Sequence, residues 1–151
     1  MKKGIFGKRN GGQAPSTNPN LIVMVEDELD ICEIVGHAFR SRGYQFKAAH
    51  DGQAGLDMIR SMRPALVLLD IQLPVMNGYQ VLAVMQQDPG LADIPVFVMT
   101  SMDAEHQFSE KEWAARLKIS RFISKPYDAE AVVLLVDRAL RPSTIDADPS
   151  A

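Results

Sequence analysis

The chain alternates between short apolar runs and longer segments whose apolar residues recur at helical spacing, and this alternation constrains the fold most. Short continuous apolar runs are typical of strands that are buried on both faces of a parallel sheet. The predicted strands cover residues 21–25, 44–49, 66–69, 96–99 and 121–124. The predicted helices cover residues 29–42, 52–62, 79–87, 104–118 and 128–141. We therefore expect an α/β fold, a doubly wound five-stranded parallel sheet with helices on both faces.

The two ends of the chain differ from this alternating region. Residues 1–20 and 142–151 are rich in Gly, Pro, Ser, Asn and other small or polar residues. Such segments bury too little apolar surface to offset the entropy lost on ordering. We expect two disordered tails around one domain over residues 21–141.

Charge is distributed unevenly along the chain. The formal net charge is −3, yet residues 1–20 carry four Lys or Arg residues and no acid. Residues 21–140 carry 11 Lys and Arg against 17 Asp and Glu, a net of −6. An acidic globule repels the phosphates of DNA, so we expect no DNA binding by the domain. The basic tail is either a solvated segment or a contact for RNA, a membrane or an acidic partner.

The sequence also predicts the compartment. No apolar run approaches the roughly 20 residues that a membrane-spanning helix needs, and the basic start precedes no apolar signal region. The one cysteine, Cys32, has no partner within the chain for a disulfide. We expect a cytoplasmic protein without a membrane span.

Polar residues stand at the ends of four of the predicted strands. Glu26 and Asp27 follow the first, Asp70 the third, Thr100 the fourth and Lys125 the fifth. The carboxyl ends of parallel strands meet at one edge of the sheet, where doubly wound folds bind their ligands. We therefore expect these side chains to lie close together.

The residue types at this edge match the requirements of phosphoryl transfer. Three carboxylates repel one another unless a cation neutralises them, and Mg²⁺ prefers such oxygen ligands. Asp70 could act as the nucleophile and form an acyl phosphate. Mg²⁺, the Lys125 ammonium and the Thr100 hydroxyl would each stabilise one oxygen of the phosphoryl group.

Structural explanations compete with this interpretation. Glu26, Asp27 and Asp70 could cap helices, and Thr100 could be a β-branched strand residue. A dehalogenase-type phosphatase would need a second aspartate two residues after Asp70, where the chain has Gln72. No glycine-rich dinucleotide or nucleoside-triphosphate motif occurs.

Four motifs in order resemble the receiver domain of two-component response regulators over residues 21–140. They are Val25-Glu26-Asp27-Glu28, Leu68-Leu69-Asp70-Ile71-Gln72-Leu73-Pro74-Val75-Met76-Asn77-Gly78, Val98-Met99-Thr100-Ser101 and Ile123-Ser124-Lys125-Pro126. Each motif alone is weak evidence. Together, in this order and at compatible spacings, they are a specific signature of the family, and most resemble its stand-alone chemotaxis-regulator-like members.

The resemblance implies a flavodoxin-like strand order of 2-1-3-4-5 and a set of site residues. Asp70 would be the phosphoacceptor. Mg²⁺ would be bound by Asp27, Asp70 and the backbone carbonyl of Gln72, with Glu26 assisting. Thr100 and Phe122 would form the switch. Phe122 can take part only through packing, because it has no hydroxyl, and it could equally be a core residue. The bond before Pro126 would be cis.

The resemblance also implies partners. A histidine kinase or a phosphotransfer protein would supply the phosphoryl group. Only ten residues follow Arg141, so we expect the response to come from a separate protein that binds the surface of the fourth helix, fifth strand and fifth helix. A phosphorelay intermediate and a phosphorylation-independent scaffold remain alternatives. In each case the protein would not be a turnover enzyme.

Two departures from the family pattern concern the region between Thr100 and Lys125. The segment Leu117-Lys118-Ile119-Ser120-Arg121 lacks the glycine that usually ends the fourth helix. Met102 places a bulky apolar side chain two residues after Thr100. This side chain could obstruct the hydrolytic water, which predicts a long-lived acyl phosphate.

Overall fold

The predicted alternation of strands and helices is present in the computed structural model, which describes residues 18–101, 115 and 118–142. The strands are β2 (Asn18–Val25), β3 (Gln45–Ala49), β4 (Pro64–Asp70), β5 (Val96–Ser101) and β6 (Arg121–Lys125). The helices are α1 (Leu29–Ser41), α2 (Gly52–Met62), α3 (Gly78–Gln87) and α5 (Ala129–Leu140). Of the helix predicted over residues 104–118, the structure describes only residues 115 and 118.

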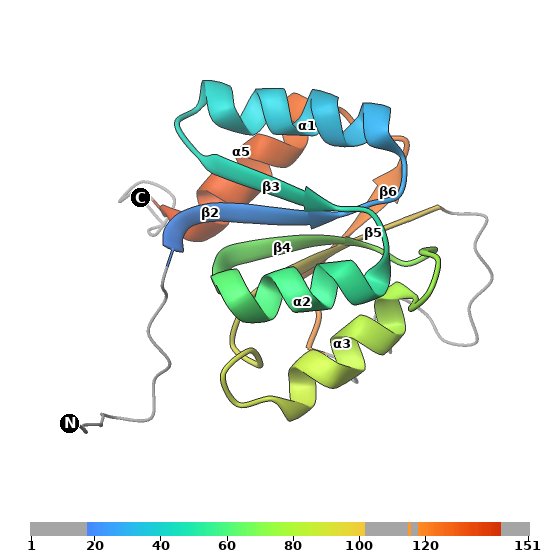
Figure 1. Ribbon diagram of the computed structural model, residues 1–151. Coiled ribbons are helices and arrows are strands. Elements are labelled where there is room, and N and C mark those ends of the chain that lie inside the picture. Colours follow the sequence, from blue (N-terminus) through green and yellow to red (C-terminus); the bar gives the residue numbers. More distant parts are fainter. Residues whose placement is uncertain (1–17, 102–114, 116–117, 143–151) are drawn as a thin grey trace.

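The strands form one parallel sheet in the order β3-β2-β4-β5-β6. This order confirms the predicted 2-1-3-4-5 topology. Helices α1 and α5 cover one face of the sheet, and α2 and α3 cover the other (Figure 1). Because each helix returns the chain to a parallel strand, the helices begin near the carboxyl edge of the sheet and end near its amino edge.

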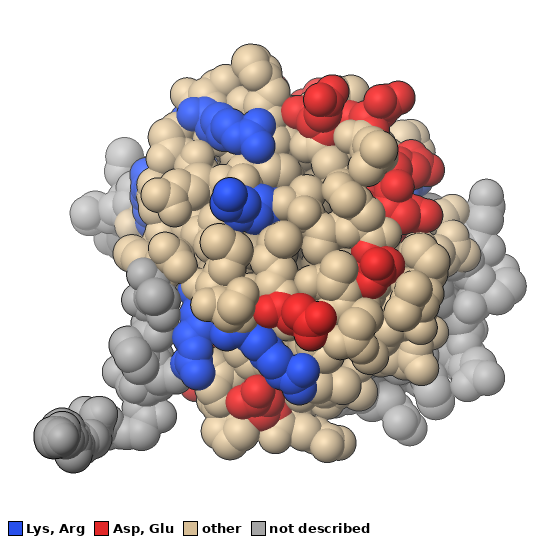
Figure 2. All heavy atoms as spheres, in the orientation of Figure 1, with Lys and Arg blue, Asp and Glu red and all other residues tan. Residues whose placement is uncertain are grey.

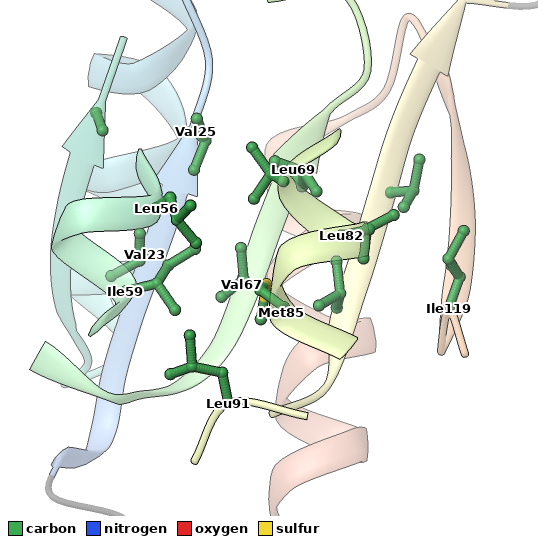
Figure 3. Close-up of a cluster of buried hydrophobic side chains, with 14 of the residues drawn as sticks. Val23, Val25, Leu56, Ile59, Val67, Leu69, Leu82, Met85, Leu91 and Ile119 are labelled. Atoms are coloured by element: carbon green, nitrogen blue, oxygen red, sulfur yellow. The ribbon is translucent and has the colours of Figure 1, made fainter. Parts of the chain in front are cut away.

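The core consists of two apolar layers, one on each face of the sheet. Along β2, Leu21, Val23 and Val25 face the layer that α2 and α3 cover. Leu56, Ile59, Leu82 and Met85 contribute to this layer from the helices (Figure 3). The intervening Ile22 and Met24 face the layer under α1 and α5. Alternation along a strand thus explains why the run in β2 is continuously apolar.

Strand β2 begins earlier than the sequence predicts. Residues 18–20 belong to the strand and not to the tail, and Asn18 pairs with Pro64 of β4. The Asn18 Nδ2 atom donates to the carbonyl oxygen of Met62 at 2.6 Å, and Asn20 Nδ2 donates to that of Gly43 at 2.7 Å. The two asparagines, whose polarity suggested a solvated tail, thus donate hydrogen bonds to carbonyl groups near the ends of α2 and α1.

Positive φ angles occur at one glycine and three other described residues. Gly43 has φ +89° where the chain leaves α1, as expected for a helix stop. Lys118 has φ 55° and lies in the segment where this chain lacks the glycine of the family pattern. Arg63 and Val75 have φ 48° and φ 71°. A β-branched residue such as Val75 rarely adopts this conformation, so the loop after β4 is strained.

Three helices begin at a side chain that caps them. Asp51 accepts a hydrogen bond from the backbone N–H of Ala54, Asn77 from that of Gln80, and Asp128 from that of Ala131. No helix in the described part of the chain is long and apolar enough to span a membrane.

Candidate functional site

The strands bring the predicted residues to the carboxyl edge of the sheet. Asp70 is the last residue of β4 and pairs with Met99 of β5. Thr100 pairs with Ser124, and Ser101 pairs with Lys125, the last residue of β6. Strand pairing therefore continues one or two residues beyond the predicted strand ends, and it aligns Asp70, Thr100 and Lys125 along the edge.

Three carboxylates converge at this edge. One oxygen each from Glu26, Asp27 and Asp70 lie within 4.8 Å of one another. Glu26 and Asp70 are buried, with 0% and 5% of their surface exposed, whereas Asp27 is exposed. This set of hard oxygen donors, open to solvent on the Asp27 side, fits Mg²⁺ bound by carboxylates and waters.

Lys125 bridges the two buried carboxylates. Its Nζ atom lies 2.9 Å from Asp70 Oδ2 and 3.1 Å from Glu26 Oε1. The other Glu26 oxygen, Oε2, accepts a hydrogen bond from the backbone N–H of Glu28 at 3.1 Å. One ammonium thus neutralises part of the negative charge of three carboxylates. The peptide bond between Lys125 and Pro126 is cis.

Burial and charge shift the pKa values of this cluster. Burial raises the pKa of Glu26 to about 7, and the negative charge of Asp70 contributes to the increase. The hydrogen bond from Glu28 and the Lys125 ammonium act in the opposite direction. Burial disfavours the charged form of Lys125, yet its hydrogen bond to Asp70 and the charges of Asp70 and Glu26 leave its pKa raised.

The loop after β4 folds back closely against Asp70. A Cβ atom at Gly78 would lie 2.4 Å from the carbonyl oxygen of Asp70, so only glycine fits there. The backbone N–H of Gln72 donates to Asp70 Oδ1 at 3.2 Å, which fixes the carboxylate from the loop side. At Val75, the N–H of Met76 donates to the carbonyl oxygen of Pro74 at 2.7 Å. This three-residue turn explains the positive φ of Val75.

Thr100 and Phe122 lie on the neighbouring strands β5 and β6, in different environments. Thr100 is buried, and its hydroxyl donates to the carbonyl oxygen of Ser101 at 3.3 Å. Phe122 is partly buried against the apolar layer under α2 and α3. Met102 lies outside the described residues.

A cavity beside the carboxylates was not evident from the sequence. Its volume is about 630 Å³, and Glu28, Gln72 and Lys125 line it together with the apolar residues Ile31, Ile34 and Val35. The hydroxyl of Tyr127, which also lines the cavity, is buried without a hydrogen-bond partner among the described residues. Burial raises the Tyr127 pKa, and the charges of Glu26 and Asp70 add to this effect. No sequence motif marks the residue after Pro126 as buried in this way.

Comparison with known proteins identifies the chain's relatives. The family model of the response regulator receiver domain matches residues 22–137. Protein Rrf1 of Nitratidesulfovibrio vulgaris is 31% identical over 122 residues, which are 81% of this chain and 83% of Rrf1. The probable transcriptional regulatory protein TcrX of Mycobacterium tuberculosis is 32% identical over 124 residues, 82% of this chain. The chain spans 50% of the length of TcrX.

Solved structures share the fold. The receiver domain of the Francisella response regulator 1452 superimposes with a TM-score of 0.71 at 16% identity. The superimposed region covers 81% of this chain and 97% of that domain. At this identity the likeness concerns the arrangement of strands and helices alone.

Proposed function

Because the chain belongs to the response regulator receiver domain family, we propose that Asp70 accepts a phosphoryl group from a histidine kinase or a phosphotransfer protein. The modified domain then binds a separate partner protein. The single observation that carries this proposal is the convergence of Glu26, Asp27 and Asp70 within 4.8 Å, bridged by Lys125. A purely structural site would seldom bury like charges together.

The residues of the site have distinct parts in the proposed reaction. An Asp70 carboxylate oxygen attacks the phosphorus atom of a phosphohistidine on the donor, and the P–N bond to the imidazole breaks. Glu26, Asp27, Asp70 and the Gln72 carbonyl would hold Mg²⁺, which would supply positive charge for the transferred oxygens. Before the reaction the Lys125 ammonium donates a hydrogen bond to Asp70. After the transfer it donates to a phosphoryl oxygen instead. Thr100 rotates its hydroxyl from the Ser101 carbonyl toward the same group.

The proposed switch couples Asp70 to the surface around β6 and α5. When Thr100 moves inward, Phe122 fills the space that it leaves, because Thr100 and Phe122 lie on the neighbouring strands β5 and β6. The partner protein would recognise β6, α5 and the fourth predicted helix in this rearranged form. We also propose a cytoplasmic location, with which the free and buried thiol of Cys32 is compatible.

Intact mass spectrometry after incubation with acetyl phosphate and Mg²⁺ tests the chemistry. We expect a gain of one phosphoryl group, about 80 Da, that requires Mg²⁺ and is lost in Asp70→Ala. Asp88→Ala is the matched control, since Asp88 follows the end of α3 at the amino edge of the sheet and should leave the gain intact. A gain that persists in Asp70→Ala would refute the assignment of the acceptor.

A small phosphodonor does not serve every receiver domain, so a failure with acetyl phosphate is followed by a panel of autophosphorylated histidine kinases. Transfer from any of them to Asp70 supports the proposal. No transfer under any condition refutes it and favours a phosphorylation-independent scaffold. Return of the group from Asp70 to a phosphotransfer protein would identify the chain as a relay intermediate.

A further inference from the structure

The three carboxylates of the site differ in how they are held. Glu26 and Asp70 both accept a hydrogen bond from Lys125, and each accepts another from the backbone N–H two residues further along the chain. Asp27 is exposed, and its carboxylate has no hydrogen bond or ion pair within the part of the chain that the structure describes. The position of this third carboxylate therefore depends on the backbone that carries it.

The backbone carbonyl of Glu26, directly before Asp27, is held by two side chains. His50 Nδ1 lies 3.0 Å from this oxygen, and Cys32 Sγ lies 3.5 Å from it. Because a carbonyl oxygen only accepts, His50 must carry a proton on Nδ1. One neutral tautomer and the imidazolium both do so, and the hydrogen bond is therefore compatible with either charge of the ring. The carbonyl belongs to the planar peptide group that links Glu26 to Asp27, so these donors fix its orientation.

His50 is the stronger of the two donors. A thiol donates weakly, and the contact from Cys32 is the longer one. The two side chains lie next to each other, with 3.9 Å between Cys32 Sγ and His50 Nδ1. Without the imidazole, only the weak thiol donor would hold the Glu26 carbonyl.

The turn that carries His50 is itself fixed. His50 directly follows β3, and the end of β3 is joined to the site because the Glu26 N–H donates to the carbonyl oxygen of Ala49 at 2.9 Å. The next residue, Asp51, caps α2 by accepting a hydrogen bond from the N–H of Ala54 at 2.7 Å. The backbone on both sides of His50 is therefore tied down.

The same turn also contacts the loop that follows Asp70. The Gly52 N–H donates to the carbonyl oxygen of Pro74 at 3.3 Å. A Cβ atom at Gly52 would lie 1.6 Å from the carbonyl oxygen of Met76, so only glycine fits there. One short turn thus contacts both loops of the site, and a side chain on it has a fixed origin from which to orient a ligand.

We propose that His50 is a positioning residue for the metal site. Its hydrogen bond to the Glu26 carbonyl orients the peptide before Asp27 and thereby places the Asp27 carboxylate for Mg²⁺. Groups that orient metal ligands in this way commonly change metal affinity roughly 10- to 100-fold. This inference rests on the proposed function, because it requires that the acidic cluster bind the metal.

Charge at the carboxyl edge does not replace this role. Most acidic side chains lie toward the right of Figure 2, where the strands of Figure 1 end. Their charge attracts a cation to this end whether or not Asp27 is well oriented. The His50 ring is neutral or positive, and loss of a positive charge would strengthen cation binding. Weaker binding without His50 would therefore report orientation and not charge.

Titration of the metal-free full chain with Mn²⁺ tests the proposal. Mn²⁺ prefers the same oxygen ligands as Mg²⁺, and the electron paramagnetic resonance signal of free Mn²⁺ gives the dissociation constant. We expect His50→Leu to raise this constant roughly 10-fold. His50→Asn should stay within about two-fold of the wild type, because its amide nitrogen is as many bonds from the backbone as Nδ1 and can donate to the same carbonyl.

His37→Leu is the matched control. His37 is also exposed, but it lies in the half of α1 that is nearer the amino edge. The same loss of an imidazole at this position should leave the dissociation constant for Mn²⁺ unchanged.

The Mg²⁺ dependence of phosphorylation by acetyl phosphate gives a second readout. His50→Leu should need roughly 10-fold more Mg²⁺ to reach half of its maximal rate. The maximal rate itself should stay within about two-fold of the wild type, because every group that contacts the phosphoryl oxygens is retained. General damage to the fold would lower the maximal rate as well.

The outcomes separate this inference from the proposed function. Equal dissociation constants in His50→Leu and the wild type would overturn the inference and leave the metal site in place. Equal weakening in His50→Leu and His50→Asn would also overturn it, because the donated hydrogen bond would then have no role. If the wild type binds no Mn²⁺, or if Asp27→Asn does not weaken binding, both the proposed metal site and the inference are refuted.

Discussion

The two edges of the sheet use polar residues in opposite ways. At the carboxyl edge, Glu26, Asp27 and Asp70 bring like charges within 4.8 Å, and Lys125 is the ammonium that bridges two of them. At the amino edge, polar groups meet complementary partners. The Tyr44 hydroxyl donates to Asp137 Oδ1 at 2.5 Å and thereby ties the start of β3 to α5.

This contrast separates stability from chemistry within one small domain. Tyr44 is almost fully buried, and burial together with its hydrogen bond to Asp137 raises its pKa to about 12, so the pair is stable at neutral pH. Burial raises the pKa of Glu26 to about 7, so its charged form is disfavoured at the same pH. The hydrogen bond at the amino edge therefore stabilises the fold. At the carboxyl edge, repulsion between buried carboxylates destabilises the fold, but it keeps groups in place that can react.

Lys125→Met should have the largest effect on both properties. The variant leaves Glu26 and Asp70 without the ammonium that bridges them, and breaking a buried ion pair in this way costs about 3 kcal/mol of unfolding free energy. Phosphoryl transfer to Asp70 should slow at least about 100-fold, because a positive group on the transferred oxygens is lost. Urea unfolding and phosphorylation kinetics measure the two effects. A variant as stable and as reactive as the wild type would show that the bridge has no role.

The pH dependence of stability tests the cost of burying Glu26. Its pKa is raised from 4.5 to about 7, so the folded state binds the proton more tightly than the unfolded state. This contribution to stability is fully present below about pH 4.5 and is lost as the pH rises through about 7. In metal-free protein the loss should be about 3 kcal/mol, measured by denaturant unfolding.

Glu26→Gln is the control for this prediction. Glutamine does not titrate, so the decline in unfolding free energy between pH 5 and pH 8 should be smaller in the variant by about that amount. An identical decline in both proteins would assign the pH dependence to other groups.

Tyr44→Phe tests the amino edge. Loss of a buried hydrogen bond to a carboxylate should lower the unfolding free energy by about 1.5 kcal/mol. The rate of phosphorylation at Asp70 should not change, because Tyr44 lies at the opposite edge of the sheet. A slower reaction in this variant, at a temperature where it is fully folded, would mean that the two edges are coupled.

Val75→Gly should have the smallest effect and sharpens the comparison within the site loop. Val75 has φ 71° and is 81% exposed, so its side chain contributes strain and little packing. Glycine adopts this angle freely, and we expect a gain of about 0.5 to 1 kcal/mol in unfolding free energy. A loss of stability would show that the turn at Val75 is not strained.

Much of the site could be predicted because its residues follow continuous apolar runs. Such runs are typical of buried parallel strands, and their carboxyl ends must share an edge, so the positions of Glu26, Asp70, Thr100 and Lys125 followed from the pattern. The strand order came from the motif resemblance, since alternation alone does not determine which strands are neighbours.

The rest depends on contacts between residues that are distant in sequence. Asn18 and Asn20 have the composition of a tail, yet they bind carbonyl groups at residues 62 and 43. Tyr44 and Asp137 are 93 positions apart, and no local pattern links them. The buried hydroxyl of Tyr127 and the positive φ of Val75 also arise from tertiary packing, which local propensity does not encode.

A matched substitution at each edge tests the separation of stability and chemistry most directly. Asp70→Asn and Asp137→Asn remove one carboxylate charge each, and both variants are assayed for phosphoryl incorporation and for unfolding free energy without Mg²⁺. We predict that Asp70→Asn accepts no phosphoryl group and is at least as stable as the wild type. We predict that Asp137→Asn is phosphorylated normally but is about 1 kcal/mol less stable. Phosphorylation of Asp70→Asn, or its loss in folded Asp137→Asn, would contradict the account.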